Sequence, residues 1–155
     1  MQISVRPLQL ADDAEISDLA SAAVLSVEGR RGGGEYLELF HHLEGLHGEE
    51  LTELLATSQR EVLVGLLDGH LFAACVLRHD AAVLTVEALY VDPEAREVGL
   101  GAALMKAAQQ RAEDLQCERF EALALPGDRH MKQRAESEAM KARLLVLSKA
   151  LRERS

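Results

Sequence analysis

The sequence predicts a single α/β domain on a mixed β-sheet, with elements in the order β-α-α-β-β-β-α-β-α-β. Two observations lead to this prediction. Apolar residues recur at helical spacing in the first part of the chain and again after residue 99, whereas short β-rich runs between tight turns fill the middle. A length of 155 residues fits one domain, and no repeat, linker or low-complexity segment divides residues 1–155.

The first two elements follow from local signals. Residues 3–6 alternate and end at Pro7, which is typical of a short strand. Apolar residues then recur at helical spacing over 16–27, behind a capping aspartate at position 12 or 13. These signals predict a strand followed by an amphipathic helix.

A run of arginine and glycine at 30–34 ends this first helix. A second, less regular helical region is expected over 35–57, and glycines at 45 and 48 interrupt it. Glu35 and Glu38 stand at its start. A flexible loop followed by a surface helix accounts for them, since acidic residues are common on solvated faces.

The middle of the chain is predicted to contain three strands, at 61–67, 71–77 and 83–91. Asp68-Gly69 is a strong hairpin signal, and His79-Asp80 turns the chain into the third strand. Strands joined in this way form an antiparallel meander. Pro93 ends the third strand, because proline has no N–H to donate to the sheet.

The last third begins with the clearest helix, 99–116, whose apolar side chains form one stripe. A strand at 120–125 becomes apolar on both faces, as a central strand does. Pro126-Gly127-Asp128 leads into a short polar helix. The segment 142–147 is predicted to close the chain as a final strand.

Composition and charge exclude several classes of protein. A net charge of −9 argues against a nucleic-acid binder, which needs a basic surface, and it mildly favours a cationic substrate such as an amine. Solubility alone also explains the acidity. No apolar run approaches the ~20 residues of a membrane span, and no signal peptide is visible, so a cytoplasmic protein that binds no membrane is expected.

The sequence predicts no metal site and no disulfide. Cys75 and Cys117 stand alone in apolar or helical contexts, which is typical of two separate thiols in a cytosolic protein. His41, His42 and His47 are close in sequence, but no cysteine or pair of carboxylates completes a set with metal-ligand spacing.

The segment 89–102 carries the clearest chemical signal, because a strand runs through a short loop into the first turn of the long helix. The first N–H groups of a helix have no partner within it, and the helix dipole makes that end positive. Gly99 and Gly101 let a ligand approach the backbone, and Arg96 adds a charge. Such an end suits an anion, and most naturally a pyrophosphate.

Three other interpretations of this segment compete. A P-loop needs Gly-Lys followed by Ser or Thr, which is absent, and a dinucleotide fingerprint needs a glycine where Leu104 stands. That fingerprint also needs a parallel βαβ start, whereas the strand here belongs to a meander. In the third interpretation the two glycines only permit close helix packing.

Arg96-x-x-Gly99-x-Gly101 resembles the acetyl-CoA signature of the GNAT superfamily of N-acetyltransferases, Gln/Arg-x-x-Gly-x-Gly/Ala. The preceding Leu-Tyr-Val-Asp-Pro, 89–93, is similar to the end of that family's fourth strand. The expected order of strands and helices also matches the family over nearly the whole chain. Segments 125–129 and 142–146, with Lys132 between them, are similar to an uncharacterised group of bacterial GNAT proteins. In that group an Arg-Gly-Gly segment leads into the helix that borders the acceptor pocket, so the resemblance implies that Glu35 and Glu38 would meet a cationic amine.

The resemblance implies that acetyl-CoA is the co-substrate. The strand backbone would pair with the pantetheine arm, and the amides of the loop and helix would hold the pyrophosphate. The cofactor-binding residues implied in this way are Leu89, Tyr90, Val91, Arg96, Glu97, Val98, Gly99, Leu100, Gly101 and Ala102. A backbone N–H near Leu89 would polarise the thioester carbonyl, and the amine would attack it directly, without an acyl-enzyme.

Attack by an amine that is protonated at neutral pH needs a base. Glu87 is the candidate catalytic residue, because it stands where many family members carry a carboxylate on this strand. The alternative is an ordinary strand charge at a solvated or ion-paired position. The resemblance leaves both open.

The general acid departs from the family pattern. The family often carries a tyrosine on the last helix to protonate the leaving thiolate, and the matching position is Ala135. The usual asparagine is Asp128, and the closing glycine and phenylalanine are Ala139 and Met140. Either the coenzyme A thiolate leaves without a general acid from the protein, or this member of the family is slow or has lost its activity. Tyr36 reaches the site only if region 33–45 folds over it.

The sequence therefore predicts acetyl transfer from acetyl-CoA to a primary amine of a small molecule or a protein. A catalytically weak acyl-CoA-binding or regulatory domain with the same fold is the rival, and a dinucleotide enzyme is a third option that the meander disfavours. A homodimer is expected to be possible, with the apolar final strand taking part.

Overall fold

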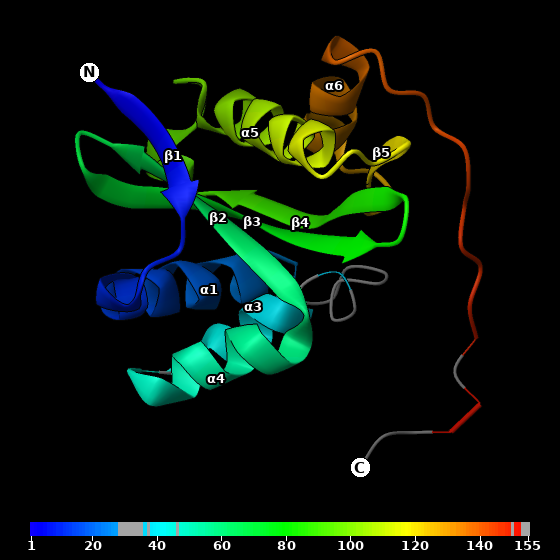
Figure 1. The fold of residues 1–155 in the computed structure, drawn as a ribbon. Coiled ribbons are helices and arrows are strands. Elements are labelled where there is room, and N and C mark those ends of the chain that lie inside the picture. The colour runs from blue at the N-terminus through cyan, green and yellow to red at the C-terminus, as the bar shows by residue number, and fades with distance from the viewer. Residues whose placement is uncertain (28–35, 37, 46, 150, 153–155) are drawn as a thin grey trace.

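The computed structural model describes residues 1–27, 36, 38–45, 47–149 and 151–152, without the side chains of residues 39, 41 and 58. A single mixed sheet organises the described part of the chain, with strands in the order β1-β2-β3-β4-β5 (Figure 1). All neighbouring strands are antiparallel except the parallel pair β4 and β5. The strands are β1 (Ile3–Pro7), β2 (Arg60–Leu67), β3 (His70–Asp80), β4 (Val83–Val91) and β5 (Arg119–Ala122).

Helices cover both faces of the sheet and form three layers (Figure 1). One face carries α1 (Asp13–Val27), α3 (Glu38–Leu43) and α4 (Glu49–Ser58). The other face carries α5 (Leu100–Asp114) and α6 (Arg129–Ser137). Two short 3-10 turns, Leu10–Asp12 and Pro93–Ala95, precede α1 and α5. None of the helices in the described part of the chain is long and apolar enough to cross a membrane.

The expected second helical region consists of two helices, α3 and α4, and the chain between them has positive φ at Gly45 and Gly48. The interruption predicted at these glycines is confirmed. The predicted break at 30–34 and Glu35 lie outside the described residues. Glu38 begins α3 and is exposed.

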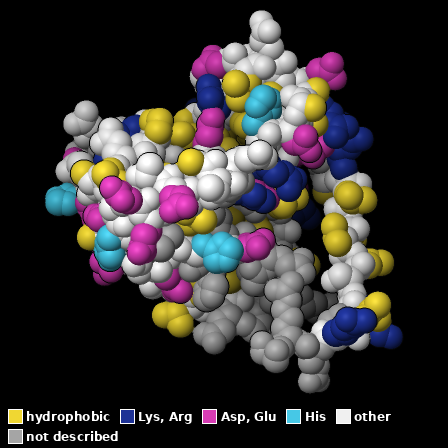
Figure 2. All heavy atoms as spheres, turned by 60° about the horizontal axis from the view of Figure 1, so that its bottom comes forward, with side chains coloured by type: hydrophobic (Ala, Val, Ile, Leu, Met, Phe, Trp, Pro, Cys, Tyr) yellow, Lys and Arg dark blue, Asp and Glu magenta, His cyan; other side chains and the backbone are white. Residues whose placement is uncertain are grey.

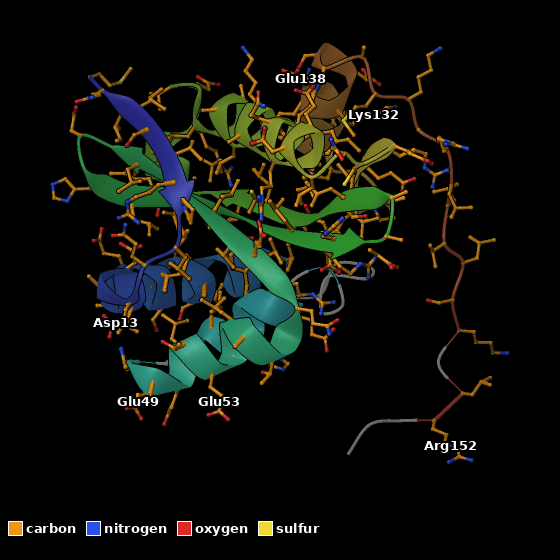
Figure 3. The ribbon with its side chains drawn as sticks, viewed as in Figure 1. Asp13, Glu49, Glu53, Lys132, Glu138 and Arg152 are labelled. Carbon is orange, nitrogen blue, oxygen red and sulfur yellow. The ribbon has the colours of Figure 1, made fainter. Side chains whose placement is uncertain are left out.

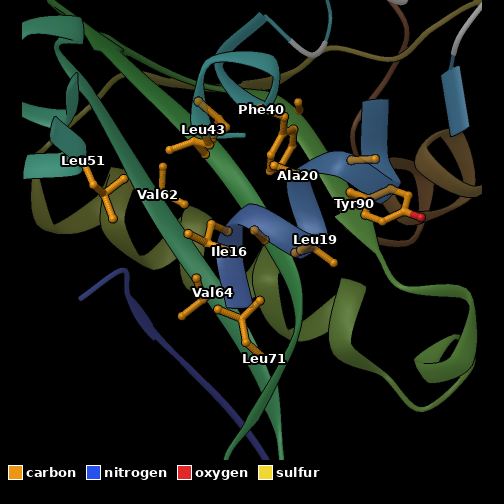
Figure 4. Packing of buried hydrophobic residues seen from close by; sticks show 14 of the residues in the cluster. Ile16, Leu19, Ala20, Phe40, Leu43, Leu51, Val62, Val64, Leu71 and Tyr90 are labelled. Atoms are coloured by element: carbon orange, nitrogen blue, oxygen red, sulfur yellow. The ribbon is translucent and has the colours of Figure 1, made fainter. Parts of the chain in front are cut away.

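Two hydrophobic clusters lie on opposite faces of the sheet, because alternate strand residues point to opposite sides. The cluster against α1 includes Ile16, Val64 and the ring of Tyr90 (Figure 4). The cluster against α5 includes Leu104 and the fully buried Cys75. Burial on both faces explains why these strands are nearly continuous apolar runs.

A β-bulge at Glu87 interrupts the pairing of β3 with β4. Val76 pairs with Ala88 and Leu77 pairs with Val86, so Glu87 has no partner on β3. The extra residue reverses the alternation: before it Val86 belongs to the cluster against α5, and after it Leu89 does. The bulge therefore sets which way the functional end of β4 faces.

The predicted final strand at 142–147 is wrong, and so is the end of the expected element order. These residues form no regular element, and their apolar side chains are exposed, between 79% for Leu145 and 92% for Leu147. The segment leaves the domain as an extended tail (Figures 1 and 2). β-rich composition favours a strand only where another strand's edge supplies hydrogen bonds, and here no edge meets the segment.

The expected strand at 120–125 is shorter in the structure and ends at Ala122. Pairing of β5 with β4 runs from Val83↔Arg119 to Val86↔Ala122, and one further hydrogen bond joins Leu123 N to Val86 O at 2.9 Å. Beyond this point the two strands separate. The separation leaves one edge of β4 without a β5 partner over residues 87–91.

Candidate active site

The unpaired edge of β4 presents backbone groups from Leu89 and Val91. On the β3 side, Asp92 N donates to Phe72 O at 2.8 Å, so the even-numbered residues at this end of β4 face β3. The odd-numbered residues face outward: Leu89 N donates to the Tyr36 hydroxyl at 3.4 Å, and Val91 O accepts from Arg96 Nε at 3.3 Å. An extended ligand can therefore pair with Leu89 and Val91 as an added strand.

Tyr90 plays a different part at the same edge. It pairs with Ala74 of β3, and its ring lies in the cluster beneath the sheet (Figure 4). Burial raises the pKa of Tyr90, with Asp92 acting in the same direction and Arg96 in the opposite one. The side chain is thus a core group, and its backbone faces away from the open edge.

The N-terminus of α5 lies directly after this edge. Glu97 and Gly99 both have positive φ, 68° and 97°, and Ala103 N is the first N–H to bond back, to Gly99 O at 3.0 Å. No described side chain caps the helix, so the amides of Leu100, Gly101 and Ala102 keep the unpaired geometry of a first turn. Such a turn is an anion-binding concavity at the positive end of a dipole.

Arg134 of α6 lies over this turn. A Cβ at position 101 would lie 2.6 Å from Cζ and 2.8 Å from Nη2 of Arg134, and closer still to Nε. Gly101 therefore lets a guanidinium rest on the first turn of α5. This is a different reason for the glycine from helix packing alone.

The surroundings of Arg134 do not neutralise it. Burial lowers the pKa of Arg134, and the nearby Arg96 also lowers it, while Asp128 and Tyr36 act in the opposite direction. Among the described residues, no carboxylate forms an ion pair with this guanidinium. A partly buried cation beside another cation, at the positive end of a helix, is a costly arrangement that an anion would relieve.

Tyr36 lies at the same edge, although it is more than fifty residues away in sequence. It is half-buried and packs against the cluster on the α1 face. Its hydroxyl is within 3.4 Å of Leu89 N, the amide expected to polarise a thioester carbonyl. The Tyr36 hydroxyl therefore lies at the edge of β4 beside Leu89.

Glu87 lies at the bulge where β4 and β5 separate, and its carboxylate faces two arginines. Arg60 approaches it with Nε at 2.6 Å from Oε1 and Nη2 at 3.3 Å from Oε2, and Arg78 Nη1 lies 3.5 Å from Oε2. The side chain is 17% exposed. The hydrogen bond that Arg60 donates to Glu87 is the main reason why the pKa of Arg60 is raised. The carboxylate is therefore held on the β3 side of β4 by arginines of β2 and β3.

The last helix, α6, carries no general acid at position 135, where the family often has a tyrosine. Asp128 caps α6 by accepting from Met131 N at 3.1 Å, and Ala135 carries no hydroxyl. The buried Met131 fixes α6 against α5. In Figure 3, Lys132 of α6 and Glu138, which directly follows that helix, lie across the sheet from Asp13, Glu49 and Glu53.

The structure brings the predicted cofactor residues together at one end of β4 and α5, with Glu87 beside them. Sequence reasoning did not single out Arg134, because nothing in a polar helix marks one arginine among several. The one signal in the sequence was Gly101, because a glycine there indicates that another group comes close to the backbone. We expected that group to be a ligand, whereas the structure shows the Arg134 guanidinium at this place.

A sequence model described as the acetyltransferase (GNAT) family matches residues 33–134. The chain belongs to the GNAT acetyltransferase family. The matched region contains β2 to β5, α5, Tyr36, Glu87 and Arg134. GNAT proteins use acetyl-CoA, so the family makes acetyl-CoA the co-substrate and N-acetyl transfer the reaction class.

Solved structures share the GNAT fold at low sequence identity. A ribosomal-protein-alanine N-acetyltransferase from Brucella melitensis is 18% identical, with a TM-score of 0.69 over 97% of this chain and 100% of that chain. An aminoglycoside acetyltransferase from an uncultured soil metagenomic sample is 15% identical, with a TM-score of 0.69 over 97% of both chains. A predicted acetyltransferase from Clostridium acetobutylicum, solved with acetyl-CoA, is 9% identical, with a TM-score of 0.65 over 97% of both. No curated protein matches the chain by sequence.

Proposed function

We propose that this GNAT protein transfers the acetyl group of acetyl-CoA directly to a primary amine of a small molecule or a peptide. One observation supports the proposal above the others: the outward Leu89 N–H lies on the edge of β4 that β5 leaves unpaired, and the uncapped turn at Gly101 lies at the same end of the sheet. The first suits a thioester carbonyl and the second suits a pyrophosphate. Acetyl-CoA carries both groups.

The residues present fit acetyl-CoA along its length. Leu89 and Val91 would pair with the amides of the pantetheine arm, and the backbone from Glu97 to Ala102 would bind the pyrophosphate. Arg96 and Arg134 would add charge-assisted hydrogen bonds to the same phosphates. A bound pyrophosphate also explains why two arginines lie beside one helix N-terminus.

Glu87 is the proposed base, acting directly or through a water. The ion pair with Arg60 fixes its carboxylate on the β3 side of the bulge, so a water would relay the proton from an amine that approaches at the opposite edge of β4. The acceptor need only present an uncharged nitrogen to the thioester carbonyl, while Leu89 N–H stabilises the developing oxyanion. No acyl-enzyme is needed.

The proposed acceptor is an amine. In solution an amine is protonated, and the net charge of −9 on the chain attracts this cationic form. The solved relatives named above include one that modifies ribosomal-protein alanine and one that modifies aminoglycosides. Peptide N-termini, aminoglycosides and polyamines are therefore the acceptors to test first.

A catalytically weak acyl-CoA-binding domain is the second candidate. Ala135 favours it, because α6 carries no hydroxyl where the resemblance places the general acid. Binding without turnover would support this candidate.

The first test is thermal unfolding of the purified protein with acetyl-CoA, coenzyme A or NAD. A ligand that binds only the native state raises the midpoint by mass action, by about 2.7 kcal/mol of stability at 100 times its Kd. We expect both coenzyme A forms to raise the midpoint and NAD to leave it unchanged. Release of the free thiol is then followed with an alanine-initiated peptide, an aminoglycoside and a polyamine. No shift with either coenzyme A form would overturn the proposed function.

We further propose that a second copy of the chain covers the C-terminal tail, residues 141–149. Four consecutive apolar side chains at least 79% exposed are typical of an interface, and β5 is an edge strand that can accept another strand. The tail carries Lys141, Arg143 and Lys149, opposite in sign to the net charge of the chain. Figure 2 shows its apolar and basic side chains set apart from the domain.

Removing residues 141–155 is expected to convert a dimer into a monomer, measured by sedimentation equilibrium. Thermal shift by coenzyme A should persist, because the tail contributes no described residue to the site. A full-length chain that sediments as a monomer at all concentrations would contradict the proposed dimer.

A further inference from the structure

The Tyr36 hydroxyl lies beside Leu89 N, the amide at which we expect the thioester carbonyl to bind. It accepts from Leu89 N at 3.4 Å, which is long for such a bond. A carbonyl oxygen bound to the same amide would lie beside the phenol oxygen. The thioester sulfur is bonded to the same carbon as that oxygen, so it also comes within reach of the hydroxyl.

The electrostatic surroundings suit a phenol that gives up a proton. Arg134 is near enough that Tyr36 influences its pKa, in the direction expected when negative charge on the phenol oxygen attracts the guanidinium. Arg96 adds a second positive charge to the neighbourhood, and Asp128 a negative one. A cation held beside the ring stabilises the phenolate that remains after the proton has left.

The fold holds Tyr36 in this place independently of any ligand. The residue is half-buried, packs on the hydrophobic cluster of the α1 face, and directly precedes the region of α3. Phe40 and Leu43 of α3 are fully buried in that cluster and anchor the segment. The last helix, by contrast, offers Ala135.

We propose that Tyr36 is the general acid of this enzyme, donating its proton to the sulfur of coenzyme A as the thioester breaks. This inference rests on the proposed acetyl transfer. The acceptor nitrogen forms a bond to the acetyl carbon and the carbon–sulfur bond breaks. The Tyr36 proton passes to the sulfur, the nitrogen loses its proton to Glu87 or water, and the phenolate regains a proton from solvent.

The first test detects the contact without an acceptor. The chain contains two tyrosines and no tryptophan, so a Tyr90→Phe variant leaves Tyr36 as its only tyrosine. Addition of acetyl-CoA is expected to change the tyrosine emission of this variant in a saturable way. Thermal shift gives the Kd independently. Binding by thermal shift with no change in emission would overturn the inference while leaving the proposed function intact.

The second test measures turnover in Tyr36→Phe. The kcat for acetyl-CoA, with the best amine of the panel or with water as acceptor, is expected to fall by about 100-fold. The KM for acetyl-CoA should stay within about twofold, because the ring remains. A kcat within about twofold of wild type would overturn the inference.

Ser17→Ala is the matched control for the fold of this region. Ser17 Oγ accepts from the backbone N of Gly45 at 2.8 Å, so this variant removes a hydroxyl that also ties the chain around α3 to another element. Its kcat should match wild type, and its thermal midpoint should fall as much as that of Tyr36→Phe. A wild type with no coenzyme A shift would instead refute the proposed function, and the inference with it.

Discussion

Gly101→Ala is expected to make the free protein more stable and its complex with coenzyme A weaker. Alanine is favoured over glycine inside a helix by about 0.5–1 kcal/mol, and the φ of Gly101 is not positive. The three atoms nearest to the new Cβ all belong to the flexible end of Arg134, which can move aside. The thermal midpoint of the free protein should therefore rise by about 2–4 °C per kcal/mol gained.

The same methyl group displaces Arg134 from the first turn of α5, where we place the pyrophosphate. A charge-assisted hydrogen bond contributes about 1.5–3 kcal/mol, so the Kd for coenzyme A should rise by about 10- to 100-fold. Isothermal titration calorimetry measures this change. The affinity for S-acetylpantetheine, which lacks the pyrophosphate, should change little.

Two variants make this prediction specific. Gln110→Ala introduces alanine on the exposed face of the same helix and should leave the Kd unchanged. Arg134→Ala should weaken binding as much as Gly101→Ala, and the double variant should bind no worse than either single one. Wild-type affinity in Gly101→Ala would mean that Arg134 does not contact the cofactor.

Glu87→Gln is expected to lower kcat by about 100-fold while leaving the thermal shift by acetyl-CoA intact. Glutamine keeps an oxygen for Arg60 but cannot take a proton from the amine, and general base catalysis typically contributes a factor of about 100 or more. Turnover is measured with the amine that the wild type acetylates fastest.

Glu61→Gln is the matched control. Glu61 of β2 forms a similar two-pronged ion pair with Arg111 of α5, at 2.7 and 2.9 Å, and that hydrogen bond lowers the pKa of Glu61. Both variants should lose a comparable, small amount of thermal stability, but only Glu87→Gln should lose turnover. Equal kcat in the two variants would make Glu87 a structural residue.

Most of the fold could be predicted from the sequence, because local signals mark where elements begin and end. The bounds of β4 match the prediction, since a turn precedes the strand and Asp92-Pro93 follows it. The bulge at Glu87 could not be predicted, because it exists only relative to the pairing partner on β3. The tail was predicted wrongly for a related reason. The strand propensity of residues 142–147 does not show whether another strand is available to pair with them.

The site also has a part that the sequence predicted and a part that it did not. The backbone features lie in one continuous stretch from Leu89 to Ala102, so a motif could reveal them. Arg134 and Tyr36 come from distant elements, and each matters only because folding places it against Gly101 or Leu89. The spacing of residues along the chain does not indicate that Arg134 will contact Gly101 or that Tyr36 will contact Leu89.

The burial of Cys75 has a practical consequence for work on this enzyme. Its thiol is fully enclosed opposite Leu89, on the strand next to the open edge, and burial raises its pKa to about 12. It is therefore almost never present as a thiolate, the form that attacks disulfide reagents and alkylating agents. A colorimetric thiol reagent added to the working enzyme should report the coenzyme A it releases, with Cys117 as the single background thiol.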